Sequence, residues 1–108
     1  MPKYQVKISV VRSISPEEIF GEKFYTPSGK EIKLCGLKKG EEYIVGESGN
    51  MPEGFCHHAW YGIYKGVDFI RWGGSYDDWS GEGIVYGVCP DGIRPVIFKI
   101  ERDKILEE

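Results

Sequence analysis

Apolar and polar residues alternate from Val6 to Val10, near the start of the chain. This period of two is typical of a strand that buries one face. Similar apolar runs recur further along, and the last two of them flank the turn Pro90-Asp91-Gly92. The runs predict four or five short strands, the last two paired as a hairpin, at about residues 6–10, 32–34, 42–45, 84–89 and 96–100.

The middle of the chain has helical spacing instead, because apolar residues recur at positions 56, 60, 63, 64, 67 and 70. Such spacing predicts a principal helix from about Gly54 to Arg71. Gly62 and Gly66 lie inside it, and each costs about 1 kcal/mol relative to alanine in a helix. Residues 67–72 would also suit a short strand, so the sequence leaves the end of this helix open.

A second, short helix is predicted to begin after Ser15. Ser15 suits the N-cap position, and Pro16 suits the first helical position. The acidic pair that follows favours the positive end of the helix dipole. Gly21 is expected to end this helix.

These elements predict an α+β fold, with a small, mainly antiparallel sheet of four or five strands packed against one principal helix and one short helix. The first and last strands are expected to share one sheet. A chain of 108 residues fits a single domain spanning 1–108. The highly charged segment 101–108 is expected to fray.

Charge and composition narrow the class of function. The formal net charge is −3, with both signs mixed along the chain, so no basic face for a nucleic acid is indicated. No segment has the length and hydropathy of a membrane span, and the N-terminus lacks the apolar region of a signal peptide. We therefore expect a cytoplasmic protein without a nucleic-acid or membrane partner, in which cysteines are reduced thiols.

The three cysteines, Cys35, Cys56 and Cys89, are the strongest candidates for chemistry. They occur singly, without the paired spacing of a zinc ribbon or a bacterial ferredoxin. Three dispersed thiolates could still meet in the fold and bind zinc or an iron–sulfur cluster. His57 or His58 could supply a further ligand. The leading hypothesis is therefore a cysteine-ligated metal or iron–sulfur binding module.

Two other functions remain open. Cysteine is among the most buried residue types, so the three thiols could be structural in a non-catalytic, oligomeric binding or interaction protein. Exposed sheet edges would favour such a homo-oligomer. A third alternative is a thiol-based redox enzyme that uses Cys56 in the first turn of the principal helix, where the dipole stabilises a thiolate. The adjacent His57 points roughly 100° away around a helix and is poorly placed as its base.

Aromatic residues crowd the segment from Trp60 to Trp79, close to Asp77, Asp78 and Glu82. They could line a pocket for a small-molecule ligand, whose identity the sequence leaves unknown. Core and interface packing is the interpretation that aromatic residues favour more often. Arg94 follows the Pro90-Asp91-Gly92 turn and suits an ion pair at that corner. No nucleotide-binding or common hydrolytic motif is present, so no catalytic residue is assigned.

Two blocks of sequence are distinctive beyond their composition. The first is Met51-Pro52-Glu53-Gly54-Phe55-Cys56 with Ala59-Trp60, and the second runs from Cys89-Pro90-Asp91-Gly92 to Arg102. In these blocks the chain resembles a family of small prokaryotic proteins of about 100 residues, marked by PxGFCxxAW and CPDGxRPVxFKxER motifs. The resemblance implies a common fold and marks the three cysteine positions. It implies no particular reaction.

Overall fold

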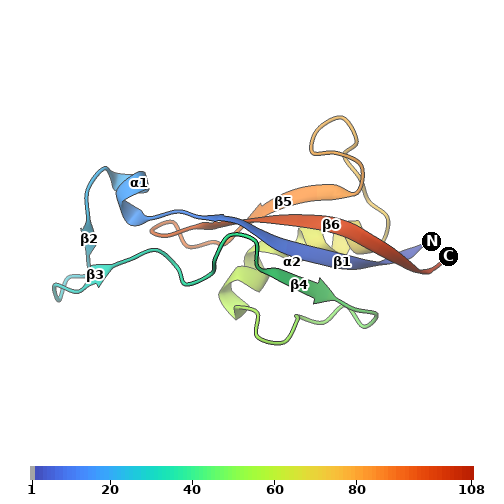
Figure 1. Cartoon of the computed structure of the whole chain (residues 1–108), viewed down its shortest axis with the longest axis horizontal. Coiled ribbons are helices and arrows are strands. Elements are labelled where there is room, and N and C mark those ends of the chain that lie inside the picture. The colour runs from blue at the N-terminus through green and yellow to red at the C-terminus, as the bar shows by residue number, and fades with distance from the viewer. Residues whose placement is uncertain (1) are drawn as a thin grey trace.

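The computed structural model describes residues 2–108, and it confirms the α+β class. A four-stranded antiparallel sheet has the order β4-β1-β6-β5, and β2 and β3 form a separate small hairpin (Figure 1). The strands are β1 (Lys3–Ser13), β2 (Phe24–Tyr25), β3 (Glu31–Ile32), β4 (Glu42–Val45), β5 (Ile84–Val88) and β6 (Val96–Glu107). The helices are α1 (Pro16–Phe20) and α2 (His57–Arg71).

The first and last strands, β1 and β6, form the centre of the sheet. Their register pairs Ile8 with Ile100 and Lys3 with Glu107. The expectation that 101–108 frays is therefore wrong, because β6 continues to Glu107. The charges in this segment have partners across the strands: Lys3 Nζ lies 2.9 Å from Glu107 Oε1, and Gln5 Nε2 donates to Asp103 Oδ2 over 2.6 Å.

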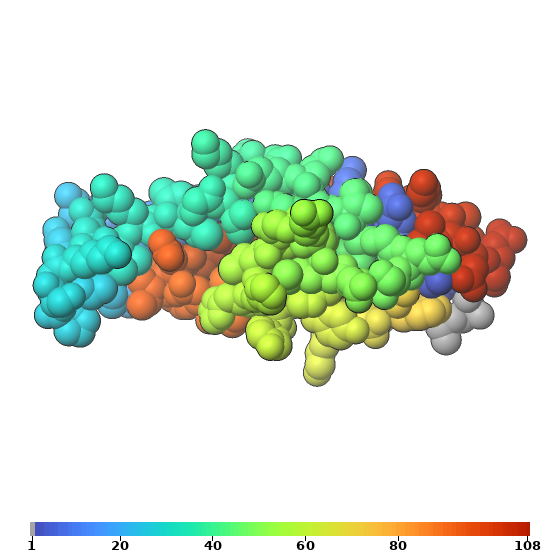
Figure 2. All heavy atoms as spheres, turned by 90° about the horizontal axis from the view of Figure 1, so that it is seen from below, coloured from blue at the N-terminus to red at the C-terminus, as the bar shows by residue number. Residues whose placement is uncertain are grey.

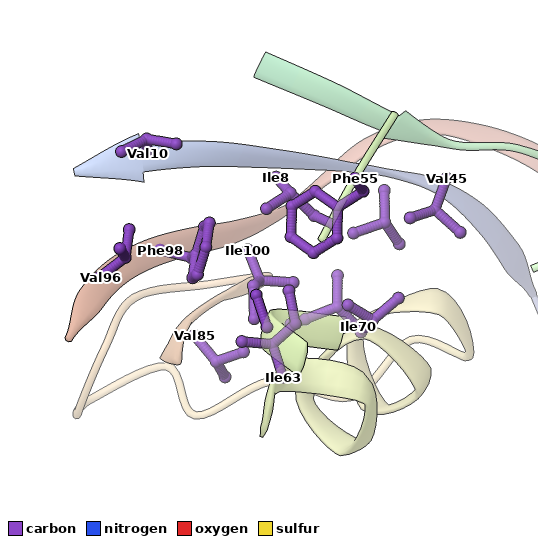
Figure 3. Packing of buried hydrophobic residues seen from close by; sticks show 13 residues of the cluster. Ile8, Val10, Val45, Phe55, Ile63, Ile70, Val85, Val96, Phe98 and Ile100 are labelled. Atoms are coloured by element: carbon purple, nitrogen blue, oxygen red, sulfur yellow. The ribbon is translucent and has the colours of Figure 1, made fainter. Parts of the chain in front are cut away.

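One face of the sheet packs against α2, as Figure 3 shows for the side chains of β1 and β6 that point toward the helix. The helix contributes Ala59, Ile63, Val67 and Ile70, which repeat every three or four residues and so lie on one side of it. Burying each large aliphatic side chain contributes roughly 1.5–3 kcal/mol. The buried core consists of Val6, Ile8, Val10, Val45, Phe55, Ala59, Ile63, Val67, Ile70, Val85, Val96, Phe98 and Ile100.

The principal helix ends at Arg71 as predicted but begins three residues later than Gly54. A turn precedes it, in which Phe55 N donates to Pro52 O over 3.1 Å. Cys56 consequently occupies the N-cap position instead of the first turn. The alternative of a strand over 67–72 is wrong, because this segment continues the helix to Arg71.

Residues 14–34, which we call the arm, project from one end of the molecule (Figures 1 and 2). The arm contains α1 and the β2–β3 hairpin. Ser15 caps α1 in a capping box with Glu18, and Gly21 closes the helix with a φ of 79°, which confirms the predicted start and end. The arm contributes to a long, flat shape of 53 × 31 × 20 Å.

Candidate functional site

Cys56 stands at the N-cap of α2 because the preceding residue, Phe55, anchors this end of the helix in the core. The Phe55 ring is 4% exposed and lies 4.9 Å from the Tyr43 ring and 5.5 Å from the Phe98 ring, measured between centroids. The Cys56 side chain is exposed and makes no hydrogen bond to the helix. Its thiol is therefore free to react or to bind.

Cys89 follows β5 and is brought to α2 by a close contact between two backbones. A Cβ atom on Gly62 would lie 2.6 Å from Pro90 Cδ and 2.7 Å from Val88 O, the residues on either side of Cys89. Only glycine allows the turn to approach the helix so closely. Cys89 N donates to Val96 O over 3.0 Å, which holds the thiol at the start of the turn before β6.

Cys35 comes directly after the arm, and Arg94 fastens this segment to the Cys89 turn. Arg94 Nη1 donates to Lys33 O over 3.2 Å, and its Nε lies 3.8 Å from Asp91 Oδ2, so the ion pair expected at this corner is present. On the other side, Ser13 Oγ donates to Leu37 O over 2.5 Å. Figure 2 shows the orange turn after β5 between the cyan arm and the yellow-green start of α2.

We call the three cysteines together the cysteine site, and one of them, Cys89, has a perturbed thiol. Burial raises the pKa of the Cys89 thiol, and the backbone hydrogen bond from Asp91 lowers it. The negative charges of Asp91, Cys56 and Cys35 also raise this pKa. The pKa of Tyr43 is also raised, by burial first and then by the charges of Glu41 and Cys35.

The thiols are free, and within residues 2–108 no group of three or more Cys, His, Asp or Glu side chains is close enough to hold a metal ion. His57 and His58 lie exposed in the first turn of α2 and join no such group. Cys35 and Cys89 are half-buried against the core. The alternative of three buried structural thiols does not hold for Cys56, which is exposed.

The aromatic residues of the middle segment are mostly on the surface, so the expectation of core packing is wrong for them, and the expectation of interface packing stays a prediction. Trp79 is 90% exposed and Tyr61 is 84% exposed. On the outer side of α2 an open hollow of about 430 Å³ is lined by Trp60, Tyr61, Gly62, Tyr64 and Lys65. Since Gly62 also contacts the Cys89 turn, this hollow lies beside the cysteine site.

Sequence reasoning found the cysteines but missed what positions them. The sequence predicts only that Gly62 weakens the helix, whereas the structure shows that it is the contact point for the Cys89 turn. The sequence predicts Tyr43 only as part of a strand, whereas its ring packs against Phe55, the residue before Cys56. The unusual glycine in a helix of large apolar residues was the one available signal.

The chain is a small α+β protein with a helix-covered antiparallel sheet and three free cysteines. Comparison with protein-family models, with curated proteins and with solved structures gave no match to this chain. None of the described helices is long and apolar enough to cross a bilayer.

Proposed function

We propose that this protein is a metal-binding module in which Cys35, Cys56 and Cys89 ligate zinc or an iron–sulfur cluster. The observation that carries the proposal is the way the fold fastens together three segments that are far apart in sequence. Gly62 receives the Cys89 turn on α2, and Arg94 joins that turn to the segment before Cys35.

The chemistry of the donors fits soft metals. Thiolates favour zinc, copper(I) and iron–sulfur clusters over magnesium and calcium, which prefer oxygen ligands. Three protein thiolates would leave one position for water, a substrate or a further ligand. His57 and His58 follow Cys56 directly, so either imidazole is a candidate for that position.

Metal binding in this site would require the sulfur atoms to approach one another, since they do not form a ligand cluster in the structure. Cys56 is the thiol best able to move, because its side chain is exposed and without a hydrogen bond to the helix. Cys35 and Cys89 are held more firmly by their packing against the core. We therefore expect binding to change the Cys56 side chain most.

The test is metal analysis with an absorption spectrum on protein purified without oxygen. Stoichiometric zinc, or iron and sulfide with visible charge-transfer bands, supports the proposal. Cobalt(II) added to metal-free protein reports thiolate ligation by intense near-ultraviolet bands. These bands should be lost in Cys35→Ser, Cys56→Ser and Cys89→Ser.

Two matched controls are His57→Ala and His58→Ala. Loss of affinity in one of them identifies the fourth ligand, whereas unchanged binding in both leaves the three thiolates as the complete protein ligand set. A folded protein that takes up no zinc, iron or cobalt contradicts the proposal. If that protein instead forms a disulfide between Cys56 and another cysteine on mild oxidation, the thiol-based redox function replaces it.

A further inference from the structure

The four-stranded sheet has two outer strands, β4 and β5, and they differ in how far the described chain covers their free edges. At the start of β5, Ile84 N donates to Gly81 O over 3.2 Å, and Ser80 Oγ donates to Ile84 O over 2.5 Å. At the end of β5, Val88 O lies against Gly62 of α2, where a Cβ atom would come within 2.7 Å of it. A loop and a helix thus close the two ends of the β5 edge.

The edge of β4 is open instead. Val10 N of β1 donates to Glu41 O over 2.9 Å, which sets the hydrogen-bonding phase between β1 and β4. Because antiparallel strands direct alternate residues toward the partner, Glu42 and Ile44 direct their N–H and C=O groups away from β1. Within residues 2–108 the structure gives these four groups no hydrogen-bond partner. In Figure 1, β4 is the lowest strand of the sheet, and Figure 2 looks onto this side from below.

The side chains of β4 leave this edge suited to pairing. In natural proteins, proline or unpaired charges keep an open edge from pairing with another chain. β4 contains no proline, and its one charged side chain, Glu42, already has Lys7 Nζ at 3.7 Å on the neighbouring strand. Donors and acceptors that alternate along a straight edge match the backbone of another extended strand. The row of free groups therefore fits an added strand.

We propose that β4 pairs with β4 of a second copy of this chain, so that two four-stranded sheets form one continuous sheet about a two-fold axis. Such an axis makes the two β4 strands antiparallel and lets one edge serve as its own partner. The free groups fix the register. With Glu42 of each copy opposite Ile44 of the other, the four free groups of each β4 are all used. With Ile44 opposite itself, Glu42 would face Gly46, whose carbonyl already accepts from Gly49 N.

The same register gives the dimer a side-chain contact at its centre. Tyr43 lies between Glu42 and Ile44, so it would stand opposite Tyr43 of the second copy at the axis. Its ring is on the side of the sheet that carries Phe55, 4.9 Å from that ring between centroids. Aromatic pairs across two antiparallel strands stabilise their pairing.

Pairing through β4 does not depend on metal ligation, so its test is separate. Sedimentation velocity on the full chain, with and without zinc, measures the dissociation constant of the dimer from millimolar to micromolar protein. Ile44→Pro removes an N–H that points away from β1, and it should raise that constant by about tenfold or more, because two hydrogen bonds are lost per dimer.

Tyr86→Pro is the matched control on the other edge. Because Cys89 N donates to Val96 O, the strand alternation directs the Tyr86 N–H away from β6, as the Ile44 N–H is directed away from β1. The control therefore removes the same kind of group from β5. It should leave the dissociation constant unchanged.

Charge exchange tests the register. Ile44→Glu places a glutamate opposite Glu42 of the second copy and should weaken the dimer. Adding Glu42→Lys turns both contacts into pairs of opposite charge and should restore it. If Ile44 instead stood opposite itself, the second substitution would restore nothing, and the proposed register would be wrong.

Amide hydrogen exchange on the unchanged protein reports the pairing directly, even if a variant does not fold. The amides of Glu42 and Ile44 should be protected in concentrated protein and should exchange freely after dilution to the monomer. Circular dichroism checks that each variant is folded. A monomer over the whole concentration range overturns the proposal, and so does a dimer that forms only with zinc. A dimer without protection of these two amides, or one that Tyr86→Pro disrupts while Ile44→Pro does not, overturns it as well.

Discussion

Gly62 of α2 lies directly against Pro90, so that a Cβ atom on Gly62 would come within 2.6 Å of Pro90 Cδ. The neighbouring Val88 O would lie 2.7 Å away, and backbone atoms cannot rotate aside as the end of a side chain can. The contact fixes the distance between the helix and the turn that carries Cys89. Because Gly62 has a hydrogen atom where alanine has a methyl group, the turn can lie against the helix, and this contact sets the position of the Cys89 thiol.

Gly62→Ala is therefore expected to destabilise the protein even though alanine is the better helix former. The gain in helix propensity is about 1 kcal/mol, and the steric cost of overpacking is about 1–3 kcal/mol, with the backbone contacts placing it at the upper end. Chemical denaturation measures the change in the free energy of unfolding. Gly66→Ala is the matched control, because its Cβ would meet only the side-chain ends of Val85 and Ile100 at 3.2–3.3 Å. A larger loss in Gly66→Ala than in Gly62→Ala would contradict the argument.

The three thiols should differ in reactivity in metal-free protein. Cys56 is exposed and should be alkylated first. Cys89 has a raised pKa, through burial and then through the charges of Asp91, Cys56 and Cys35, so less of it is thiolate at neutral pH. The alkylation rate of an ordinary thiol levels off once the thiol is ionised. The rate of Cys89 should still rise at these pH values, because its pKa is higher. Mass spectrometry of iodoacetamide-treated protein as a function of pH measures both rates.

Asp91→Asn serves as a check on the cause of that shift. The substitution removes a negative charge near the Cys89 sulfur and keeps an oxygen that can accept the hydrogen bond from Ile93 N. The pKa of Cys89 should fall, and its alkylation should become faster at neutral pH. Equal rates for Cys89 and Cys56 in the unchanged protein would show that the electrostatic description is wrong.

The capping box of α1 should respond to acid in a defined direction. The pKa of Glu18 is lowered, mainly by the hydrogen bond from the Ser15 backbone, and the charge of Arg12 also lowers it. A group whose pKa falls on folding stabilises the folded state above its unfolded pKa, and this contribution is lost as the pH falls through the folded pKa. Carboxyl NMR titration should place Glu18 below the ordinary glutamate range, and Arg12→Ala should raise it. An unchanged titration in Arg12→Ala would remove the ion pair from the explanation.

Phe55 is expected to stabilise both the core and the cysteine site. It is 4% exposed and contacts Tyr43 and Phe98, so Phe55→Ala should cost about 3–5 kcal/mol of unfolding free energy. Phe55→Leu keeps most of the apolar volume and should cost less. If the alanine variant retains stability, Phe55 does not anchor the start of α2.

Local patterns in the sequence predicted the elements well, because each depends on neighbouring residues. The box at Ser15 defines α1, and the alternation around Ile8 defines β1. The prediction that segment 101–108 frays is wrong, because its charged residues pair with Lys3 and Gln5, which are far away in sequence. A run of charged residues at the end of a sequence predicts a solvated tail, because the sequence does not show which strand lies opposite it.

The candidate site was only partly predictable for the same reason. The cysteines can be identified by residue type. The positions of the Cys89 turn and of the segment before Cys35, however, depend on Gly62 and Arg94, whose partners lie on other elements. Core packing of the aromatic segment is not what the structure has, because composition does not show which side of α2 the sheet covers. Tyr61 and Ile63 differ by two positions and lie at 84% and 2% exposure.

The pairing of β1 with β6 has a consequence for how the protein is made. Gln5 of β1 and Asp103 of β6, which share a hydrogen bond, are 98 positions apart, and their two strands form the middle of the sheet. Contacts this distant in sequence form slowly and only once both partners exist. During synthesis, β4 and α2 have no completed sheet to pack on until β6 has left the ribosome. All three cysteines precede β6, so their thiols are exposed to the cell before the sheet is complete.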